Sequence, residues 1–358
     1  MGSICSSYFT NISTSSMNNE SYSLYPSFEN SKYLQLKHFH YLTTLGEGSF
    51  GKVILVRRKS NERLYAIKLI NTDRLIDLRK REYAMFERQV LVEFQNPFIV
   101  KLHHIFESSG KLCFVLDFMQ GGNLGFHLKR HNRFNNSVVA FFAAEVIVAL
   151  EILHKREFIY RDLKPENILL DIDGHIKLAD FNLSTTIEDL NDSICGSPEY
   201  AAPEVLSGEI QGIELDFWGF GVLLYHMLQG TTPFRASSYF DICKNILLSK
   251  YNFTSNFDKN AIDLISKLLM ANPKERLTDH MSIKNHKFFA DVDWASVEAR
   301  SLESPIKLRV ENPLDLKYFP KKKYPSMIFS AQGELDVNQN DQSNYSQFSD
   351  FSYNSEIN

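Results

Sequence analysis

The segment at residues 160–182 constrains this chain most strongly, because it sets four polar residues at fixed spacing between apolar runs. YRDLKPENILL (160–170) supplies Asp162, Lys164 and Asn167, and LADFN (178–182) adds Asp180. Phosphoryl transfer needs such groups: one carboxylate to orient the attacking hydroxyl, a carboxylate and an amide to bind Mg²⁺, and an ammonium to offset charge on the phosphoryl group. A charged loop between two strands is the simpler interpretation, but it leaves the other elements described below unexplained.

A glycine-rich segment, GEGSFGKV at 46–53, predicts a phosphate-binding element nearer the start of the chain. Glycines let backbone N–H groups approach phosphate oxygens without a clash from Cβ. The same spacing opens dinucleotide-binding folds, but there a helix follows the glycines, whereas the β-branched run VILVRR follows here. We therefore expect a hairpin loop that binds nucleotide phosphates through Gly46, Glu47, Gly48, Ser49, Phe50 and Gly51.

A lysine on the next predicted strand is a further phosphate ligand. Lys68 lies in YAIK, 17 residues after Gly51, although a solvated strand lysine is the alternative. An anion must hold such a lysine in register, and the helix expected at about 75–93 offers several glutamates. Glu87 comes just before apolar residues that would pack inward, so it is the predicted partner; a surface pair along the helix is the alternative.

The remaining nucleotide contacts are expected to be apolar side chains and backbone groups, as in most small-molecule pockets. They are Val53, Ala66 and Leu169 around the adenine, Leu116 behind it, and Asp117, Phe118 and Met119 in the segment that is expected to join the small β-rich lobe to the helical lobe.

Two regions of different character predict an α+β fold with two lobes. Residues 40–119 contain strand-like runs separated by turn signals, and the pattern from 123 onward is mostly helical. We expect a disordered tail at 1–39, one bilobal domain at 40–289 (small β-rich lobe 40–119, helical lobe 120–289) and a polar C-terminal tail at 290–358.

Composition limits the partners and the compartment. The net charge of −4 argues against a general nucleic-acid binder, and the four cysteines are few and scattered, as in a reducing compartment. The most apolar run, Val138 to Leu153, carries Glu145 and Glu151 and is predicted to be a buried helix rather than a membrane span. Residues 1–15 lack the features of a secretory signal, so a cytoplasmic protein is expected.

Together these residues resemble the protein kinase superfamily over roughly 40–289, and within it the AGC group of protein kinases A, B and C. YRDLKPEN, CGSPEY at 195–200, PIKLRV at 305–310 and FSDFSY at 348–353 carry the finer resemblance. The resemblance implies a bilobal kinase fold and an enzyme that uses ATP and Mg²⁺ to phosphorylate Ser or Thr hydroxyls of proteins. It also implies a role in intracellular signalling, a monomeric catalytic unit and an upstream activating kinase.

The resemblance assigns roles to individual residues. Asp162 would be the catalytic base that orients the substrate hydroxyl, and Lys164 favours Ser or Thr acceptors over Tyr. Contacts with the protein substrate are implied for Glu166, Ser197 and Glu199, the last two in the docking loop CGSPEYAAPE at 195–204.

Other residues would hold this machinery in place. Glu204 is expected to form a buried ion pair with Arg276, and Asp216 to brace the backbone of the catalytic loop. Phe319 would lie near the adenine, and Trp218 is expected in the core rather than in a binding site.

The C-terminal motif FSDFSY resembles the hydrophobic motif of AGC kinases, which folds back onto a groove of the small lobe beside the helix of the Lys–Glu pair. Phe348 and Phe351 would fill that groove, and phosphorylated Ser352 would meet basic residues nearby. The alternative is two stray aromatic residues in a disordered tail.

The chain departs from the family pattern at DFN, where Asn182 replaces the Gly of DFG, as it does in YANK-type kinases. Because Asn is, after Gly, the residue most tolerant of positive φ, we expect activity with a stiffer magnesium loop. DFN and an acidic activation segment support a second function, a pseudokinase scaffold or allosteric partner. A small-molecule kinase is a third, which the docking loop and C-terminal tail disfavour.

Substrate and activation-segment residues also differ. Basophilic AGC kinases read upstream arginines with acidic side chains at three places; here Glu166 is kept, but Asn123 and His226 occupy the other two. We expect a weaker need for upstream arginine. Ser193 occupies the phosphosite of the activation segment and Arg161 is its expected cationic partner, but acidic neighbours could partly substitute for the phosphate.

The first residues, MGSICS, fit a myristoylation signal with Gly2 as the acceptor. A single myristoyl chain binds membranes only marginally, and Cys5 is a candidate palmitoylation site that would supply the second anchor. Membrane association of a cytoplasmic kinase is therefore a further expectation.

Overall fold

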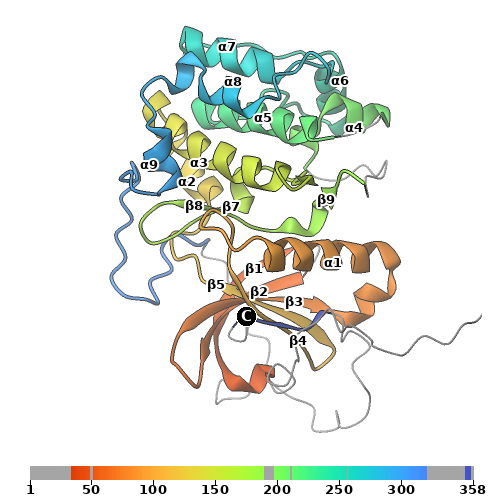
Figure 1. Ribbon diagram of the computed structural model, residues 1–358, viewed down its shortest axis with the longest axis vertical. Helices are drawn as coiled ribbons and strands as arrows, with labels where there is room; N and C mark the ends of the chain where they lie inside the picture. Colours follow the sequence, from red (N-terminus) through yellow and green to blue (C-terminus); the bar gives the residue numbers. More distant parts are fainter. Residues whose placement is uncertain are drawn as a thin grey trace, which may run out of the picture.

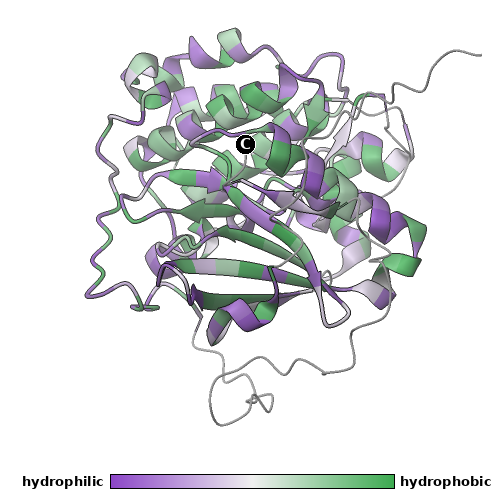
Figure 2. Cartoon of the chain, turned by 60° about the horizontal axis from the view of Figure 1, so that its bottom comes forward, coloured by the Kyte–Doolittle hydropathy of each residue, from purple (hydrophilic) through white to green (hydrophobic). Residues whose placement is uncertain are grey.

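The chain folds into a small lobe built on one antiparallel sheet and a larger helical lobe, which confirms the predicted α+β bilobal fold (Figure 1). The computed structural model describes residues 34–48, 51–188, 197–209, 212–255, 257–320 and 351–355. Apolar residues run along the strands of the sheet and the helices above it (Figure 2). The active-site residues discussed below come from both lobes.

The sheet of the small lobe has six strands in the order β1-β2-β3-β5-β4-β10, all paired antiparallel. Its register places Lys68 opposite Val53 on one side and Phe114 on the other, in the middle of the sheet. The sequence does not predict β4, because two histidines interrupt its apolar pattern. The strands are β1 (Phe39–Gly48), β2 (Gly51–Arg58), β3 (Leu64–Asn71), β4 (Leu102–Ser108), β5 (Lys111–Asp117) and β10 (Tyr353–Asn354).

Helix α1 (Leu78–Glu93) lies between the sheet and the helical lobe (Figure 1). It begins three residues later than Leu75, because a short 3-10 helix, Thr72–Ile76, precedes it. Asp77 caps α1 by accepting a hydrogen bond from the backbone N–H of Arg79. This cap fixes where the helix begins and therefore which of its side chains face the sheet.

The small lobe begins earlier than predicted, because residues 34–39 are ordered and belong to it rather than to the tail. Leu36–His38 form a 3-10 helix, and Leu36 and Phe39 are buried. The Phe39 ring stacks on Phe106 of β4 with 6.2 Å between ring centroids. These apolar contacts explain why the small lobe includes residues before the predicted boundary at residue 39.

Helix α3 (Asn136–His154) lies in the core of the helical lobe. Its length and composition would allow it to cross a membrane, but about two thirds of its most apolar window is buried inside the protein, in agreement with the predicted core helix. Trp218 on α5 (Glu214–Gln229) is fully buried and stacks on Phe234, as expected of a core residue. The helices of this lobe are α2 (Leu124–His131), α3, α4 (Pro203–Ser207), α5 (Glu214–Gln229), α6 (Tyr239–Leu247), α7 (Lys259–Leu268), α8 (His280–Lys284) and α9 (Trp294–Glu298).

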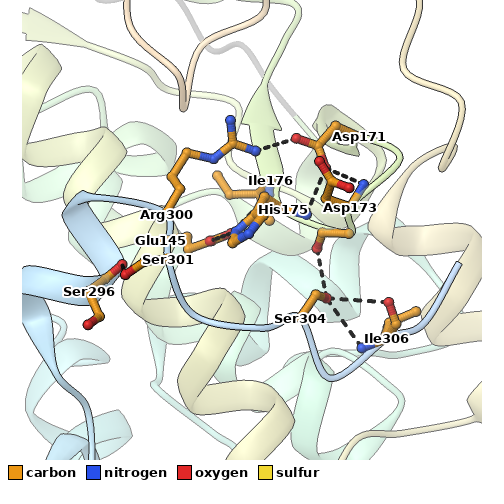
Figure 3. Close-up of polar contacts among 11 residues, drawn as sticks. Glu145, Asp171, Asp173, His175, Ile176, Ser296, Arg300, Ser301, Ser304 and Ile306 are labelled. Carbon is orange, nitrogen blue, oxygen red and sulfur yellow. Dashed lines mark hydrogen bonds and ion pairs between the residues drawn. The ribbon is translucent and has the colours of Figure 1, made fainter.

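Polar contacts fasten the chain after α9 to the turn between β7 (Ile168–Leu170) and β8 (Ile176–Leu178) (Figure 3). Arg300 forms an ion pair with Asp171, and the Ser304 hydroxyl donates to the carbonyl oxygen of Gly174 at 3.0 Å. Gly174 has φ +84°, and a Cβ there would lie 2.5 Å from the Ser304 oxygen, so the contact requires glycine. The anchored segment then runs along the side of the molecule to the connection between the lobes, where Phe319 stacks on Phe118 (Figure 1).

The end of the chain docks on the sheet, as the resemblance implies for this motif. Strand β10 pairs with β4, and Phe351 is fully buried in the apolar core. Arg88 on α1 donates to the Phe351 carbonyl oxygen at 3.3 Å, so the docked segment lies beside the helix that carries Glu87. Phe348 lies outside the described residues, and phosphorylation of Ser352 remains a prediction.

Removal of the Phe351 side chain is expected to release this segment locally. Core Phe→Ala substitutions cost about 3–5 kcal/mol, and a two-stranded pairing at a chain end opens before the domain unfolds. We expect Phe351→Ala to speed hydrogen exchange in peptides that cover β4. Phe240→Ala is the matched control, because Phe240 is 74% exposed. Unchanged exchange in β4 would show that the docked segment does not depend on Phe351.

Candidate active site

A pocket of about 970 Å³ is lined by residues of both lobes and gathers most of the predicted site. Ser49, Phe50 and Ser193 lie outside the described residues, as do Gly2 and Cys5. Glu199 does not line the pocket. The predicted residues that do are Gly46, Glu47, Gly48, Gly51, Val53, Ala66, Lys68, Glu87, Leu116, Asp117, Phe118, Met119, Asp162, Lys164, Glu166, Asn167, Leu169, Asp180, Ser197 and Phe319.

The structure adds pocket residues that the sequence analysis missed. Leu45 and Tyr318 directly precede predicted residues, and Tyr83 lies one helical turn before Glu87, so proximity could have suggested them. Tyr318 is held there by Gly122, which has φ +70° and whose Cβ would lie 2.4 Å from the Tyr318 carbonyl oxygen. Val100 also lines the pocket, and nothing in the sequence around it indicates this position.

The glycine-rich segment forms the predicted hairpin, with Gly48 opposite Gly51 at the ends of β1 and β2. Gly51 has φ +153°, and a Cβ there would lie 2.1 Å from the Leu69 carbonyl oxygen. Among the described residues, no atom lies within 4 Å of a Cβ built on Gly46 or Gly48, so these residues leave the backbone there accessible from the pocket. Such open backbone is what phosphate binding by N–H groups requires.

Lys68 connects two carboxylates deep in the pocket. Its Nζ donates to both carboxylate oxygens of Glu87 at 2.7 Å and to Asp180 Oδ1 at 2.7 Å, so the predicted contact with Glu87 is present. Burial opposes the charge of Lys68, but Asp180 and Glu87 outweigh it and raise its pKa. Burial also raises the pKa of Glu87 against the opposing charge of Lys68. The ammonium is therefore held charged between helix α1 and the predicted metal ligand.

The three polar residues of YRDLKPEN contact one another. Lys164 Nζ donates to Asp162 Oδ2 at 2.5 Å, and Asn167 Nδ2 donates to the same oxygen at 2.8 Å and to the Asp162 carbonyl at 3.0 Å. Burial raises the pKa of Asp162, and the charge of Lys164 opposes that shift. The carboxylate is therefore fixed in direction and more basic than an exposed aspartate.

Asp216 on α5 braces this loop as expected. Its carboxylate accepts the backbone N–H groups of Tyr160 and Arg161, each at 2.8 Å, and contacts His154 Nε2 at 2.8 Å. Arg161 has φ +63°, an uncommon conformation that these bonds hold in place. The Tyr160 hydroxyl donates to the Ala179 carbonyl oxygen at 2.5 Å and so ties the loop to the residue before Asp180.

Asn167 and Asp180 fit a divalent cation site that is completed by substrate. Both are oxygen donors in one pocket, and Mg²⁺ typically takes only one or two carboxylates plus waters and phosphates. The described residues contain no group of three or more His, Cys, Asp or Glu side chains able to hold a metal alone. The prediction about Asn182 needs correction: the left-handed residue is Asp180 (φ 59°, ψ 67°), and Asn182 is absent from the described residues with positive φ.

Asn123 and His226, which replace two of the acidic residues expected to read upstream arginine, form contacts within the helical lobe. Asn123 caps α2 by accepting from the Phe126 N–H at 2.8 Å, and His226 contacts the Tyr200 hydroxyl at 2.7 Å. Burial lowers the pKa of His226, although the charges of Glu166 and Glu199 oppose the shift.

Glu199 and Glu166, two acidic residues expected to contact the protein substrate, already have partners. Glu199 accepts a hydrogen bond from Thr232 at 2.5 Å, and Lys129 Nζ lies 3.8 Å from a carboxylate oxygen of Glu166. Glu166 therefore has a cation nearby, whereas Glu199 keeps its negative charge because the Thr232 hydroxyl is neutral.

The expected ion pair between Glu204 and Arg276 is present and buried. The guanidinium donates to the two carboxylate oxygens at 2.6 and 2.9 Å, and also to the Glu214 carbonyl oxygen at 2.8 Å. Its carbon lies 5.1 Å from the centre of the Trp218 ring. The pair fastens the end of the docking loop to the core of the helical lobe.

Comparison with known proteins agrees with this geometry. Residues 39–289 match the family described as "Protein kinase domain". The chain is 42% identical over 291 residues to the serine/threonine-protein kinase gad8 of Schizosaccharomyces pombe, with 80% of this chain and 51% of that protein covered. It is thus similar to about half of that relative's length.

Two further relatives are covered over more of their length. Identity is 39% over 304 residues with cAMP-dependent protein kinase type 3 of Saccharomyces cerevisiae, covering 84% of this chain and 76% of that protein. It is 36% over 341 residues with RAC-beta serine/threonine-protein kinase A of Xenopus laevis, covering 90% and 68%. With the glycine hairpin, the Lys68–Glu87 pair and the Asp162 loop in one pocket, these matches show that the chain belongs to the protein kinase family, among the serine/threonine kinases of the AGC group.

Proposed function

We propose that this protein transfers the γ-phosphate of ATP to serine and threonine hydroxyls of protein substrates. The observation that carries the proposal is the pocket itself, where Lys68 contacts Glu87 and Asp180 while Asp162 contacts Lys164 and Asn167. A kinase needs both sets of contacts at once, one for the nucleotide phosphates and one for the acceptor hydroxyl.

Each contact supports one part of the transfer. Lys68, held charged by Glu87, binds nucleotide phosphates, and the hairpin backbone around Gly48 covers them. Asp162 accepts a hydrogen bond from the acceptor hydroxyl and orients its oxygen toward the phosphorus. The serine or threonine oxygen forms the new P–O bond as the bond to ADP breaks, and its proton passes to the Asp162 carboxylate. Lys164 is close enough to Asp162 to offset charge on the transferred group. Mg²⁺, which Asn167 and Asp180 would hold, neutralises phosphate charge when bound.

A pseudokinase is the second function that the sequence leaves open, and neither the site nor the relatives favour it. The groups needed for transfer are present and in contact with one another, and the named relatives are protein kinases. The replacement of Gly by Asn182 leaves the Asp180 and Phe181 of the motif unchanged, and Phe181 is fully buried.

Acceptor choice tests the proposed function. A degenerate library of serine, threonine and tyrosine peptides is incubated with Mg·ATP and the purified protein, and the phosphorylated residue is identified. We expect phosphate on serine and threonine, with tyrosine at background. Transfer to tyrosine alone, or to none of the three, would contradict the proposal.

We also propose that upstream arginine contributes little to substrate choice. An exposed ion pair is worth about 1 kcal/mol or less, so a peptide with arginine should be phosphorylated at most about fivefold faster than its alanine counterpart. Glu166→Gln should remove that preference, and Lys129→Ala should increase it, because Lys129 lies 3.8 Å from the carboxylate. Glu209→Gln, an exposed glutamate elsewhere, serves as control. A preference of 100-fold or more would contradict this proposal.

Regulation and location remain proposals that the sequence motivates. Phosphorylation of Ser193 and Ser352 by an upstream kinase would adjust activity, and lipid on Gly2 and Cys5 would bring a cytoplasmic protein to a membrane. Equal activity of wild type and Ser193→Ala would support the idea that acidic neighbours substitute for the phosphate.

A further inference from the structure

Asn182 is a buried polar residue whose side chain lacks a protein partner. Its exposure is 3%, and neither Nδ2 nor Oδ1 forms a hydrogen bond within the part of the chain that the structure describes. A buried amide group without a partner costs about 1–3 kcal/mol, so such groups are almost always satisfied. Something other than these residues is therefore expected to bind the carboxamide.

The position of Asn182 indicates what that partner is. The residue lines the nucleotide pocket together with Lys68, Glu87 and Asp180, and it lies two positions after Asp180. Its short 3-10 helix, Phe181–Leu183, packs against α1, and the Ser184 N–H closes that turn on the Phe181 carbonyl at 3.0 Å. The backbone that carries Asn182 is thus fixed at the wall of the pocket.

Neither the backbone conformation nor a hydrogen bond within the site explains why asparagine occupies position 182. The left-handed position is Asp180, so the choice of Asn at 182 is not a substitute for glycine at positive φ. The neighbouring polar groups are used within the site: Lys68 binds two carboxylates, and the Asn167 amide donates to Asp162. The Asn182 carboxamide keeps both a donor and an acceptor for a ligand.

We propose that Asn182 is a further positioning residue that hydrogen bonds to metal-bound ATP, and this inference rests on the proposed function. Its Oδ1 can accept from a water that Mg²⁺ keeps, because the ion retains several waters in such sites. Its Nδ2 can donate to a phosphate oxygen. A neutral carboxamide suits this place, since it can both donate and accept a hydrogen bond without adding charge beside Asp180.

Binding measurements separate this role from a structural one. The affinity of a non-hydrolysable ATP analogue is measured by calorimetry with Mg²⁺ and with EDTA, for wild type, Asn182→Gly and the near-isosteric Asn182→Leu. Loss of one or two hydrogen bonds should weaken binding with Mg²⁺ about five- to tenfold. In EDTA only the contact of Nδ2 with the phosphate is lost, so the loss of affinity should be clearly smaller there. Asn132→Gly is the control, because Asn132 has φ +68° and does not line the pocket.

Two results would overturn the inference. Equal loss of affinity with and without Mg²⁺ would exclude a contact that depends on the metal. Unchanged affinities with a lower Tm in both variants would assign Asn182 to a buried structural water instead. Failure of the wild type itself to bind the Mg²⁺ complex would contradict the proposed function, which these variants alone cannot do.

Discussion

Replacing Lys68 by Met is expected to lower kcat/KM by about 100-fold or more, the size of effect seen when one preorganised donor is removed from a charged transition state. Lys68 Nζ contacts Glu87 and Asp180 at 2.7 Å, so its removal takes away a phosphate ligand and leaves two carboxylates facing each other. Burial already raises the pKa of Glu87. We expect Glu87 to take up a proton in the variant, which limits the loss of stability.

Lys284→Met provides a matched control for this experiment. The Lys284 side chain is 7% exposed and forms a 2.6 Å ion pair with Glu151. Lys68 is similar, since its side chain is 9% exposed and lies 2.7 Å from Glu87. Lys284, however, lies in the helical lobe and does not line the pocket. Steady-state kinetics and thermal unfolding are measured for both variants. Similar losses of activity in the two, or a Lys68→Met enzyme with more than a tenth of normal kcat/KM, would contradict the assigned role of Lys68.

Replacing Arg276 by Met is expected to lower the free energy of unfolding by about 3–5 kcal/mol, because it leaves Glu204 buried without its partner. For a domain of this size that corresponds to a fall in Tm of roughly 6–20 °C. The bidentate pair is almost fully buried, with the two side chains 0% and 2% exposed, so solvent cannot replace the lost guanidinium.

Two further variants test the cause of that loss. Lys267→Met breaks an ion pair with Asp263 whose side chains are 50% and 54% exposed, and it should cost about 1 kcal/mol or less. The double variant Arg276→Met with Glu204→Leu removes both charges and should recover part of the stability. A single Arg276→Met variant as stable as Lys267→Met would show that the buried pair does not hold this segment.

Catalytic residues were predictable because their chemistry requires fixed spacing along the chain. Asp162, Lys164 and Asn167 fall within six residues, so one loop brings them together whatever the rest of the chain does. Glu87 required a different argument, its place before inward-facing apolar residues on a helix, and its contact with Lys68 is present.

Contacts that depend on tertiary packing were not predictable in the same way. His103 and His104 interrupt the apolar pattern of β4, yet both are buried, and His103 contacts Asp117 at 2.8 Å. Strand β10 contains only two residues, too few to show periodicity. Phe39 belongs to the small lobe because it meets Phe106 from a strand that the sequence does not reveal.

The prediction about Asn182 had the wrong physical reason. Local rules assign positive φ to glycine-like positions, but here the uncommon conformations occur at Asp180 and Arg161. Hydrogen bonds from elsewhere in the fold, such as those of Asp216 with the Tyr160 and Arg161 N–H groups, hold the loop in that conformation. No local sequence pattern reports such support.

The most direct test of the central claim is the rate of ³²P transfer from the γ-position of Mg·ATP to a serine/threonine peptide library, with wild type and Asp162→Asn side by side. We predict transfer by the wild type and a loss of about 10²–10⁴-fold in the variant, with nucleotide binding retained because Asp162 contacts Lys164 and Asn167 rather than Lys68. Equal transfer by both proteins, or nucleotide binding without any transfer by the wild type, would contradict the account.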